Sequence, residues 1–218
     1  MHAENQKYKN LALFDFDGTL CNKDSFTGFI FYALSKRHIV RKGIKILPWI
    51  QGYYLKLYPA PRMRARLYKS MFRQAKVHTL QALAQQYVQQ YLLPNLNPAL
   101  LAQLRKHQAL GDDVVLVSAS IDIYLKPLSE ALNIALICTE VETKNEHYNG
   151  VYRTPDCSSE QKKLRILAQY NLEDYAQIYA YGNSEEDLAM LSLAQQRYMV
   201  GENTELPALP LPDLESAS

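Results

Sequence analysis

Residues 11–20 read LALFDFDGTL, and this stretch decides the fold. Residues 11–16 have the composition of a buried strand, and Asp15 and Asp17 stand at its end, followed by Gly18, which allows a turn. In an open parallel sheet, ligands bind at the carboxyl ends of the strands. Paired carboxylates there suit a hard divalent cation, and one of them can act as a nucleophile toward phosphorus. The alternative is a strand that simply ends in an acidic turn.

The rest of the chain alternates short apolar runs with segments of helical periodicity. Further strands are predicted at residues 114–117, 134–138, 178–181 and 198–200, and helices at 99–109, 161–170 and 187–194. This alternation is typical of an α/β fold in which helices flank a parallel sheet. A hairpin closed by Asn149-Gly150 is also predicted within residues 140–152.

The segment between the first two predicted strands is far longer than a single crossover helix requires. We therefore predict an inserted helical domain, or cap, over residues 21–93, and a discontinuous core formed by residues 1–20 and 94–218. Prolines divide the insertion into about four helices, because a proline is expected at a helix boundary. These boundary prolines are Pro48, Pro59, Pro61 and Pro94.

The formal net charge of +2 conceals a strong segregation of charge. Residues 25–111 contain 14 of the 24 basic residues and no Asp or Glu, so the remainder has 10 basic and 22 acidic residues, a charge of −12. With 48% apolar residues the chain is long enough for a substantial core, which excludes disordered and fibrous classes.

Several features predict a cytoplasmic location. The N-terminal residues 1–10 are polar and lack the apolar segment of a secretory signal, and we expect them to be unstructured. Residues 39–58 are interrupted by charges and Pro48, so no transmembrane helix is expected. The three cysteines are odd in number and lack CxxC spacing, which argues against a disulfide framework and a zinc site.

Three further pieces of sequence follow the first motif in a fixed order. Hydroxyls at Ser118 and Ser120 follow the second strand, Lys162-Lys163 begins a helix, and an acidic segment over residues 182–187 follows the fourth strand. Each has a plain alternative: a hydroxyl caps a helix, a lysine is solvated, and acids complement a helix dipole. Four such pieces in sequence, each at an element end, are not readily attributed to chance.

With these motifs the chain resembles the haloacid dehalogenase superfamily of phosphatases, over about residues 10–201. Residues 15–20, DFDGTL, match the first motif of that family throughout. Within it, the chain is similar to the phosphoserine-phosphatase-like branch, which has a helical cap between the first and second motifs. The resemblance implies a Rossmann-like three-layer α/β/α core, dependence on Mg²⁺, and hydrolysis of phosphate monoesters through a phospho-aspartate.

The resemblance also implies a role for each motif residue. Asp15 would be the nucleophile and a metal ligand, and Asp17 the general acid and base that also gives its backbone carbonyl to the metal. Ser118, with Ser120 close enough to assist, would donate to the phosphate, and Lys162 would neutralise it, leaving Lys163 at the surface. The implied phosphate-binding residues are Ser118, Ala119 and Lys162, and the implied metal ligands are Asp15, Asp17, Asn183 and Asp187.

Two positions depart from the family pattern. Ser159 stands where the branch usually has glycine, which leaves the geometry of that turn open. Asn183 stands where the fourth motif usually has aspartate, so one ligand loses its charge and weaker Mg²⁺ binding is expected, unless Glu185 or Glu186 compensates. Three alternatives follow: a working site with weaker metal binding, an Asp-to-Asn substitution that arose in the coding sequence, or a low-activity binding protein of this superfamily.

The substrate is predicted to be a small phosphorylated metabolite. Asp24 either receives a cationic amine, as in phosphoserine or histidinol phosphate, or caps the first helix of the insertion. Three interpretations of the basic insertion are open: its cations form a solvated face, they steer phosphate esters toward the site, or they rest on an anionic membrane. The branch that the chain resembles includes relatives that act on the lipid phosphatidylglycerophosphate. No recognition motif supports nucleic-acid binding. The alternatives are thus a soluble metabolite phosphatase and a lipid phosphatase at the membrane surface.

Overall fold

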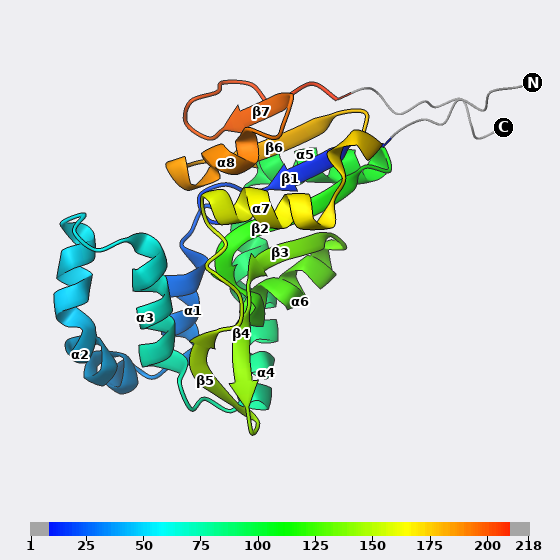
Figure 1. The fold of residues 1–218 in the computed structure, drawn as a ribbon. Coiled ribbons are helices and arrows are strands. Elements are labelled where there is room, and N and C mark those ends of the chain that lie inside the picture. The colour runs from blue at the N-terminus through cyan, green and yellow to red at the C-terminus, as the bar shows by residue number, and fades with distance from the viewer. Residues whose placement is uncertain (1–8, 210–218) are drawn as a thin grey trace, which may run out of the picture.

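The computed structural model describes residues 9–209, and its centre is a five-stranded parallel sheet of order β3-β2-β1-β6-β7 (Figure 1). Residues 1–8, most of the predicted N-terminal lead, lie outside the described residues. The strands are β1 (Leu11–Phe14), β2 (Asp113–Ile121), β3 (Ala135–Thr139), β6 (Ile178–Gly182) and β7 (Gln196–Met199). Each predicted strand is present. Because β1 pairs with β2 on one side and β6 on the other, the carboxyl ends of these three strands meet at one edge.

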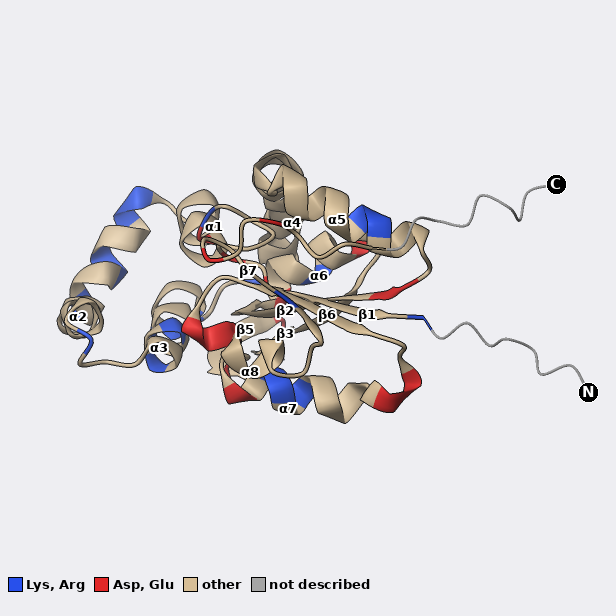
Figure 2. Cartoon of the chain, turned by 90° about the horizontal axis from the view of Figure 1, so that it is seen from above, with Lys and Arg blue, Asp and Glu red and all other residues tan. Residues whose placement is uncertain are grey.

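Helices cover both faces of this sheet because the side chains of its central strand are buried on both sides. Ala12 and Phe14 face one apolar cluster and Leu11 and Leu13 the other. Seen from above, α5 and α6 lie on one side of the sheet and α7 and α8 on the other (Figure 2). These helices are α5 (Pro98–Ala109), α6 (Asp122–Leu132), α7 (Glu160–Gln169) and the short α8 (Leu188–Leu191). The predicted three-layer α/β/α architecture is confirmed.

The insertion between β1 and β2 is helical, as predicted. Its elements are α1 (Ser25–Ala33), α2 (Lys36–Tyr54), α3 (Ala60–Phe72), α4 (Val77–Tyr87), a π-helical turn η1 (Val88–Leu92) and a 3₁₀ turn η2 (Leu93–Asn95). Pro59 does precede α3, but the boundary predicted at Pro48 is wrong, because Pro48 lies inside α2. Burial of Ile46 and partial burial of Trp49 and Ile50 on both sides of the proline hold the helix together there.

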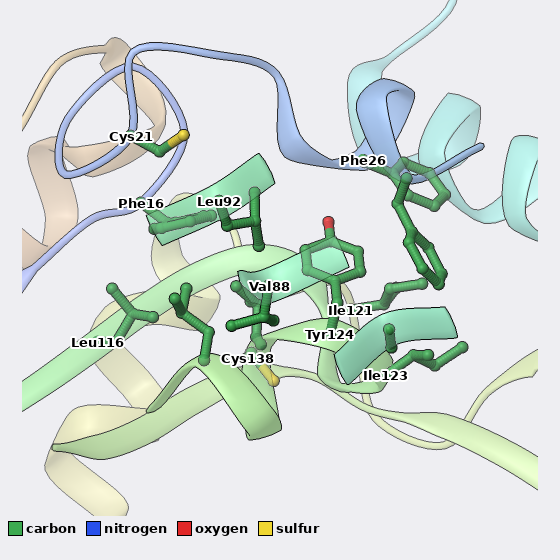
Figure 3. Packing of buried hydrophobic residues seen from close by; sticks show 14 of the residues in the cluster. Phe16, Cys21, Phe26, Val88, Leu92, Leu116, Ile121, Ile123, Tyr124 and Cys138 are labelled. Atoms are coloured by element: carbon green, nitrogen blue, oxygen red, sulfur yellow. The ribbon is translucent and has the colours of Figure 1, made fainter. Parts of the chain in front are cut away.

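The core is continuous between the sheet and the inserted helices. Val88 and Leu92 of the insertion lie beside Phe16, Leu116 and Tyr124 of the sheet region (Figure 3). Farther out, the same cluster includes buried aromatic residues of α1 and α3. The division at residues 20/21 and 93/94 stays a prediction, since packing is unbroken across it.

A hairpin outside the insertion also contacts the inserted helices. It consists of β4 (Val141–Lys144) and β5 (His147–Tyr152), and the predicted turn is wrong: Asn145 and Glu146 close it, both with positive φ of 51° and 60°. Gly150 instead lies within β5, where a Cβ would be 3.0 Å from the Cβ of Arg73, which follows α3. The glycine is needed because strand and helix approach so closely.

The remaining elements are short connections. They are the 3₁₀ turns η3 (Leu172–Asp174) and η4 (Glu185–Asp187). The helix predicted over 187–194 is therefore reduced to α8, which follows η4. Within residues 9–209, every helix is too short or too polar to cross a bilayer.

Candidate active site

The edge where β1, β2 and β6 end opens into a cavity of about 420 Å³. Its polar floor comes from four segments far apart in the sequence, and its wall comes from α1, α2 and α3. The floor residues are Asp15, Asp17, Ser118, Ala119, Ser120, Lys162, Asn183, Ser184, Glu186 and Asp187. The structure thus brings together the residues that the four motifs singled out.

Asp15 lies at the centre of this floor, directly after β1. Its Oδ1 accepts from Lys162 Nζ at 2.5 Å, and its Oδ2 accepts from the Thr19 hydroxyl at 2.9 Å. Burial raises the pKa of Asp15 to about 6, against the lowering effect of Lys162, and the carboxylates of Asp187 and Asp17 raise it further. Lys162 thus offsets only part of the cost of burying a charge on Asp15.

Asp17 is held by a different set of donors. The Ser25 backbone N–H donates to Oδ1 and the Ser120 hydroxyl to Oδ2, both at 2.6 Å. Burial raises the pKa of the Asp17 carboxyl, although these hydrogen bonds partly oppose the effect. A carboxyl group whose pKa is raised in this way suits a general acid. Ser120 thus positions Asp17 and also lines the cavity, and its predicted assistance to the phosphate stays a prediction.

Lys162 links the first and fourth motifs. Its ammonium group contacts Asp15 and also Asp187 Oδ1 at 2.6 Å, and its side chain is buried. Burial alone would lower the pKa of Lys162, but the two carboxylates outweigh it and raise the pKa above its ordinary value. The lysine is therefore a fixed positive charge on the cavity floor.

Asn183 lies where four oxygen positions converge. The amide atom that faces the cluster lies 3.2 Å from Asp187 Oδ2, 3.3 Å from Asp15 Oδ2 and 3.2 Å from the Asp17 carbonyl oxygen. With nitrogen in that position, the amide donates to all three oxygens. With oxygen there, the Asn183 oxygen lies about 3 Å from each of the other three oxygens, a spacing expected for neighbouring ligands of one octahedral Mg²⁺.

These residues therefore fit Mg²⁺. Asp15 and Asp187 both contact the single charge of Lys162, and Asp17 lies on the same floor, so the floor carries an excess of negative charge when all three carboxyl groups are ionised. Among residues 9–209, no three His, Cys, Asp or Glu side chains are placed to hold a metal ion by themselves. Of the two residues predicted to compensate for Asn183, Glu186 lines the cavity and pairs with Arg64, and Glu185 is exposed.

Two glycines permit this close packing. A Cβ on Gly18, whose φ is 83°, would lie 2.1 Å from Asn183 Nδ2. A Cβ on Gly182 would lie 2.7 Å from the Cβ of Asp187. Gly18 thus lets the first-motif loop approach Asn183, and Gly182 lets the fourth-motif loop fold tightly against its own Asp187.

Ser159 adopts backbone angles that favour glycine, with φ 49° and ψ −127°. Its N–H donates to the Glu186 carbonyl at 2.9 Å, which ties the loop before α7 to the fourth motif. We expect Ser159→Gly to raise the free energy of unfolding by about 1 kcal/mol, since such angles strain a residue with a Cβ. Urea denaturation measures this. The neighbouring Ser158→Gly, where φ is not positive, is the control, and equal or lower stability of Ser159→Gly would contradict the expectation.

Three further predicted residues have structural contacts as well. Ser118 Oγ accepts from the Ser120 N–H at 3.1 Å, and the Ala119 carbonyl accepts from the Thr139 hydroxyl at 2.7 Å. Asp24 is the N-cap of α1, where it accepts from the Thr27 N–H at 2.9 Å, and it also lines the cavity. Both alternatives weighed for Asp24 are therefore compatible with its position.

Arg64 is a cavity residue that the sequence did not single out from its neighbours. From α3 it donates to both carboxylate oxygens of Asp156, at 2.9 and 2.8 Å, and it pairs with Glu186 at 3.1 Å. It thereby joins the insertion to the loops of the third and fourth motifs. On α3, Arg62 and Arg66 are four residues apart and share one side of the helix, whereas Arg64 lies on the opposite side. This spacing was the signal available in the sequence.

Comparisons with known proteins agree with this arrangement. The sequence profile of the haloacid dehalogenase-like hydrolases matches residues 12–192. A histidinol-phosphatase of Neisseria meningitidis serogroup C (strain 8013) is 27% identical over 91% of this chain and 93% of its own. A protein of unknown function from Bordetella pertussis Tohama I superposes with a TM-score of 0.71, at 22% identity, over 88% of this chain and 90% of its own.

A more distant solved structure extends the likeness in fold. A probable phosphoserine phosphatase from Vibrio cholerae superposes with a TM-score of 0.64 at 14% identity, covering 87% of this chain and 55% of that one.

Proposed function

This chain belongs to the haloacid dehalogenase-like hydrolase family, and we propose that it is a Mg²⁺-dependent phosphatase that hydrolyses small phosphate monoesters through a phosphorylated Asp15. One observation carries the proposal: the buried carboxylate of Asp15, the buried Lys162 that contacts it and a second carboxyl group, that of Asp17, share the floor of one cavity. Its relatives in that family include a histidinol-phosphatase.

The chain's own residues account for both halves of the reaction. Lys162 draws the phosphate toward Asp15, whose carboxylate oxygen forms a bond to phosphorus as the bond from phosphorus to the leaving oxygen breaks. Asp17 gives its proton to that oxygen, so the alcohol leaves neutral. Asp17 then takes a proton from water, whose oxygen bonds to phosphorus, and the Asp15–phosphorus bond breaks to release phosphate and restore the carboxylate.

Asp15, Asp187, Asn183 and the Asp17 carbonyl would hold the metal ion. When bound, Mg²⁺ neutralises phosphate charge and so lowers the barrier to attack by an anion. Because Asn183 contributes an uncharged amide, this site carries one negative charge fewer than a site with aspartate at position 183. A working site with weaker metal binding is the alternative that we favour.

Asn183→Asp tests this assignment without relying on turnover. The added carboxylate would lie beside Asp15 and Asp187, and the hydrogen-bond donor of the amide would be lost. The metal-free variant should therefore have a lower melting temperature than the parent protein. Mg²⁺ affinity should rise at least about tenfold, because charge count sets affinity for hard cations. Thermal melting and isothermal titration with Mg²⁺ measure both effects. Unchanged melting together with unchanged Mg²⁺ affinity would contradict the assignment.

The cavity wall supports a leaving group with an aromatic or apolar body and an amine. Apolar and aromatic side chains of the insertion form much of it: Phe26, Ile50, Tyr53, Tyr54, Met63 and Leu67. Lys162 and Arg64 are the cations in the lining, and both are already paired with carboxylates. Among the described residues of the lining, a substrate carboxylate therefore finds no unpaired cation, which favours histidinol phosphate over phosphoserine.

Asp24 is the candidate receiver of the substrate amine. Asp24→Asn removes its charge, and asparagine is still a good N-cap. We expect kcat/KM to fall about tenfold or more for histidinol phosphate, the size of a charge-assisted hydrogen bond, and to change little for an aryl phosphate. Steady-state kinetics with both esters measure the difference. Equal changes for the two esters would leave Asp24 with its capping role alone.

A substrate panel tests the proposed function itself. With Mg²⁺ present, histidinol phosphate should be hydrolysed with a kcat/KM at least about tenfold above that for phosphoserine, since the missing cation leaves a buried carboxylate unpaired. Phosphatidylglycerophosphate belongs in the panel as the lipid alternative. Absence of turnover on every ester and on a generic aryl phosphate, at saturating Mg²⁺, would favour the non-enzymatic alternative.

A further inference from the structure

The apolar side chains at the surface are concentrated in one part of the molecule. Among residues 9–209, twelve large apolar side chains are exposed, and eight of them lie between Phe31 and Leu57. Leu57 is 80% exposed and Tyr54 is 78% exposed, values close to those of an extended chain. Such a concentration marks a surface that meets a partner.

Helix α2 presents most of this surface on the side turned away from α3. Val40, Ile44, Leu47 and Tyr54 follow each other at spacings of four, three and seven residues, so they lie along one side of the helix. The opposite side carries Ile46, which is buried, and Trp49, over which the Arg66 guanidinium stacks at 3.9 Å. We call the first side, with Leu55 and Leu57 beyond the helix, the outer face of α2.

Cations border this outer face and no carboxylate does so from the same segment. Lys36, Arg37, Arg41, Lys45 and Lys56 are all exposed, and residues 25–111 contain no Asp or Glu. Figure 2 shows the basic positions distributed along α2 and α3, with α2 at the edge of the molecule. A groove between α2 and α3 adds more cations; its charged lining residues are Lys42, Lys45, Arg66, Lys69 and Arg73. Among the cations of the insertion, only Arg64 lines the cavity.

We propose that the outer face of α2 docks on an anionic lipid surface. An amphipathic helix with aliphatic side chains on one side and bordering Lys and Arg is suited to the interface of a bilayer, where apolar side chains enter the acyl boundary and cations meet anionic headgroups. A second copy of the chain would bring two cationic surfaces together without any acid between them. A nucleic acid would neutralise the cations but leave Val40, Ile44 and Leu47 in water.

Docking in this way places the cavity mouth next to the lipid. Tyr54 belongs to the outer face and also lines the cavity, together with Ile50 and Tyr53 of the same helix. The lipid contact does not depend on the proposed function, because none of Val40, Ile44 or Leu47 lines the cavity.

Vesicle flotation tests the proposal with the full chain. The protein should bind vesicles of phosphatidylcholine with phosphatidylglycerol at low salt, bind them less at high salt, and bind pure phosphatidylcholine weakly. Ile44→Glu/Leu47→Glu should lower the partition coefficient at least about tenfold, since two large apolar side chains no longer enter the lipid. Hydrolysis of a soluble ester should be unchanged and reports that the variant is folded.

The matched control is Leu164→Glu/Leu167→Glu, which places the same two charges at the same spacing on exposed positions of α7. It should bind vesicles like the parent protein. If the α2 double variant does not fold, Lys36→Gln/Arg37→Gln/Arg41→Gln should weaken binding to anionic vesicles instead. The proposal would be overturned if the α2 variants bound vesicles as well as the parent protein, or if the control lost binding equally. It would also be overturned by a dimer, seen by light scattering, that only the α2 variant disrupts, or by binding to DNA without binding to vesicles.

Discussion

Asp15→Asn is expected to lower kcat/KM at least about 10⁴-fold for every phosphate ester, because removal of a covalent nucleophile leaves only binding and charge stabilisation. The amide oxygen can still accept from Lys162 Nζ, as Asp15 Oδ1 does at 2.5 Å, so the floor retains a partner for the lysine. Burial already raises the pKa of Asp15, so loss of its charge should not destabilise the metal-free protein. Turnover of an aryl phosphate, alongside thermal melting, measures both expectations.

The matched control for this variant is Asp122→Asn. Asp122 is another partly buried carboxyl group whose pKa burial raises to about 6, but it lies away from the cavity and accepts from the Val141 N–H. The control should retain turnover within about twofold, as expected for a site without contact to the substrate. Activity of Asp15→Asn within about tenfold of the parent protein would exclude Asp15 as the nucleophile.

Asp17→Asn should separate the two halves of the reaction. An aryl phosphate has a leaving group that needs little protonation, so Asp15 can still attack it, whereas water must then attack the phospho-aspartate without a general base. We expect a burst of released phenolate close to one equivalent per protein, followed by a steady rate reduced about 10³-fold. Rapid-mixing absorbance measures the burst.

The Asp17→Asn substitution keeps the hydrogen bonds that position this side chain. The amide oxygen can accept from the Ser25 N–H, and the amide nitrogen can donate to the Ser120 hydroxyl, two groups that donate to the carboxylate of Asp17 in the parent protein. For an alkyl ester, which needs its leaving oxygen protonated, the burst should be absent. A steady rate without a burst for both esters would show that Asp17 does not act as the base in the second step.

The sheet could be predicted from the sequence because its strands are largely buried and bounded by turn residues. The sequence also places Asp15, Ser118, Lys162 and Asn183 at element ends, and in a parallel sheet the strand ends meet at one edge. The local pattern and the topology together therefore determine the floor of the cavity. The catalytic roles of these residues remain proposals that the variants above test.

What the sequence missed depends on contacts between distant segments. The pairing of Arg64 with Asp156 and Glu186 joins residues 92 and 122 positions apart, and no local pattern encodes it. The same holds for Ser120, whose hydroxyl reaches Asp17 across 103 positions. Pro48 was misplaced for a related reason, since burial of Ile46 against neighbouring helices outweighs the break that proline favours.

The hairpin shows the limit of turn signals. Asn149-Gly150 has the composition of a tight turn, yet Gly150 serves the approach of β5 to α3, and Asn145-Glu146 forms the turn. Positive φ values suit asparagine, but glutamate gives no such signal. The direction of the basic side chains was similarly undetermined, because helical spacing alone does not say which face of α2 packs on α3.

Trapping of the covalent intermediate tests the central claim most directly. The parent protein and Asp17→Asn are mixed with an aryl phosphate and Mg²⁺, quenched in acid, and reduced with borohydride, which converts an aspartyl phosphate to homoserine. Peptide mass spectrometry should find homoserine at position 15, more abundantly in the variant, and none at Asp24 or Asp187 or, in the parent protein, at Asp17. Homoserine at another aspartate, or none at any position while phosphate is released, would contradict the assignment of Asp15 as the nucleophile.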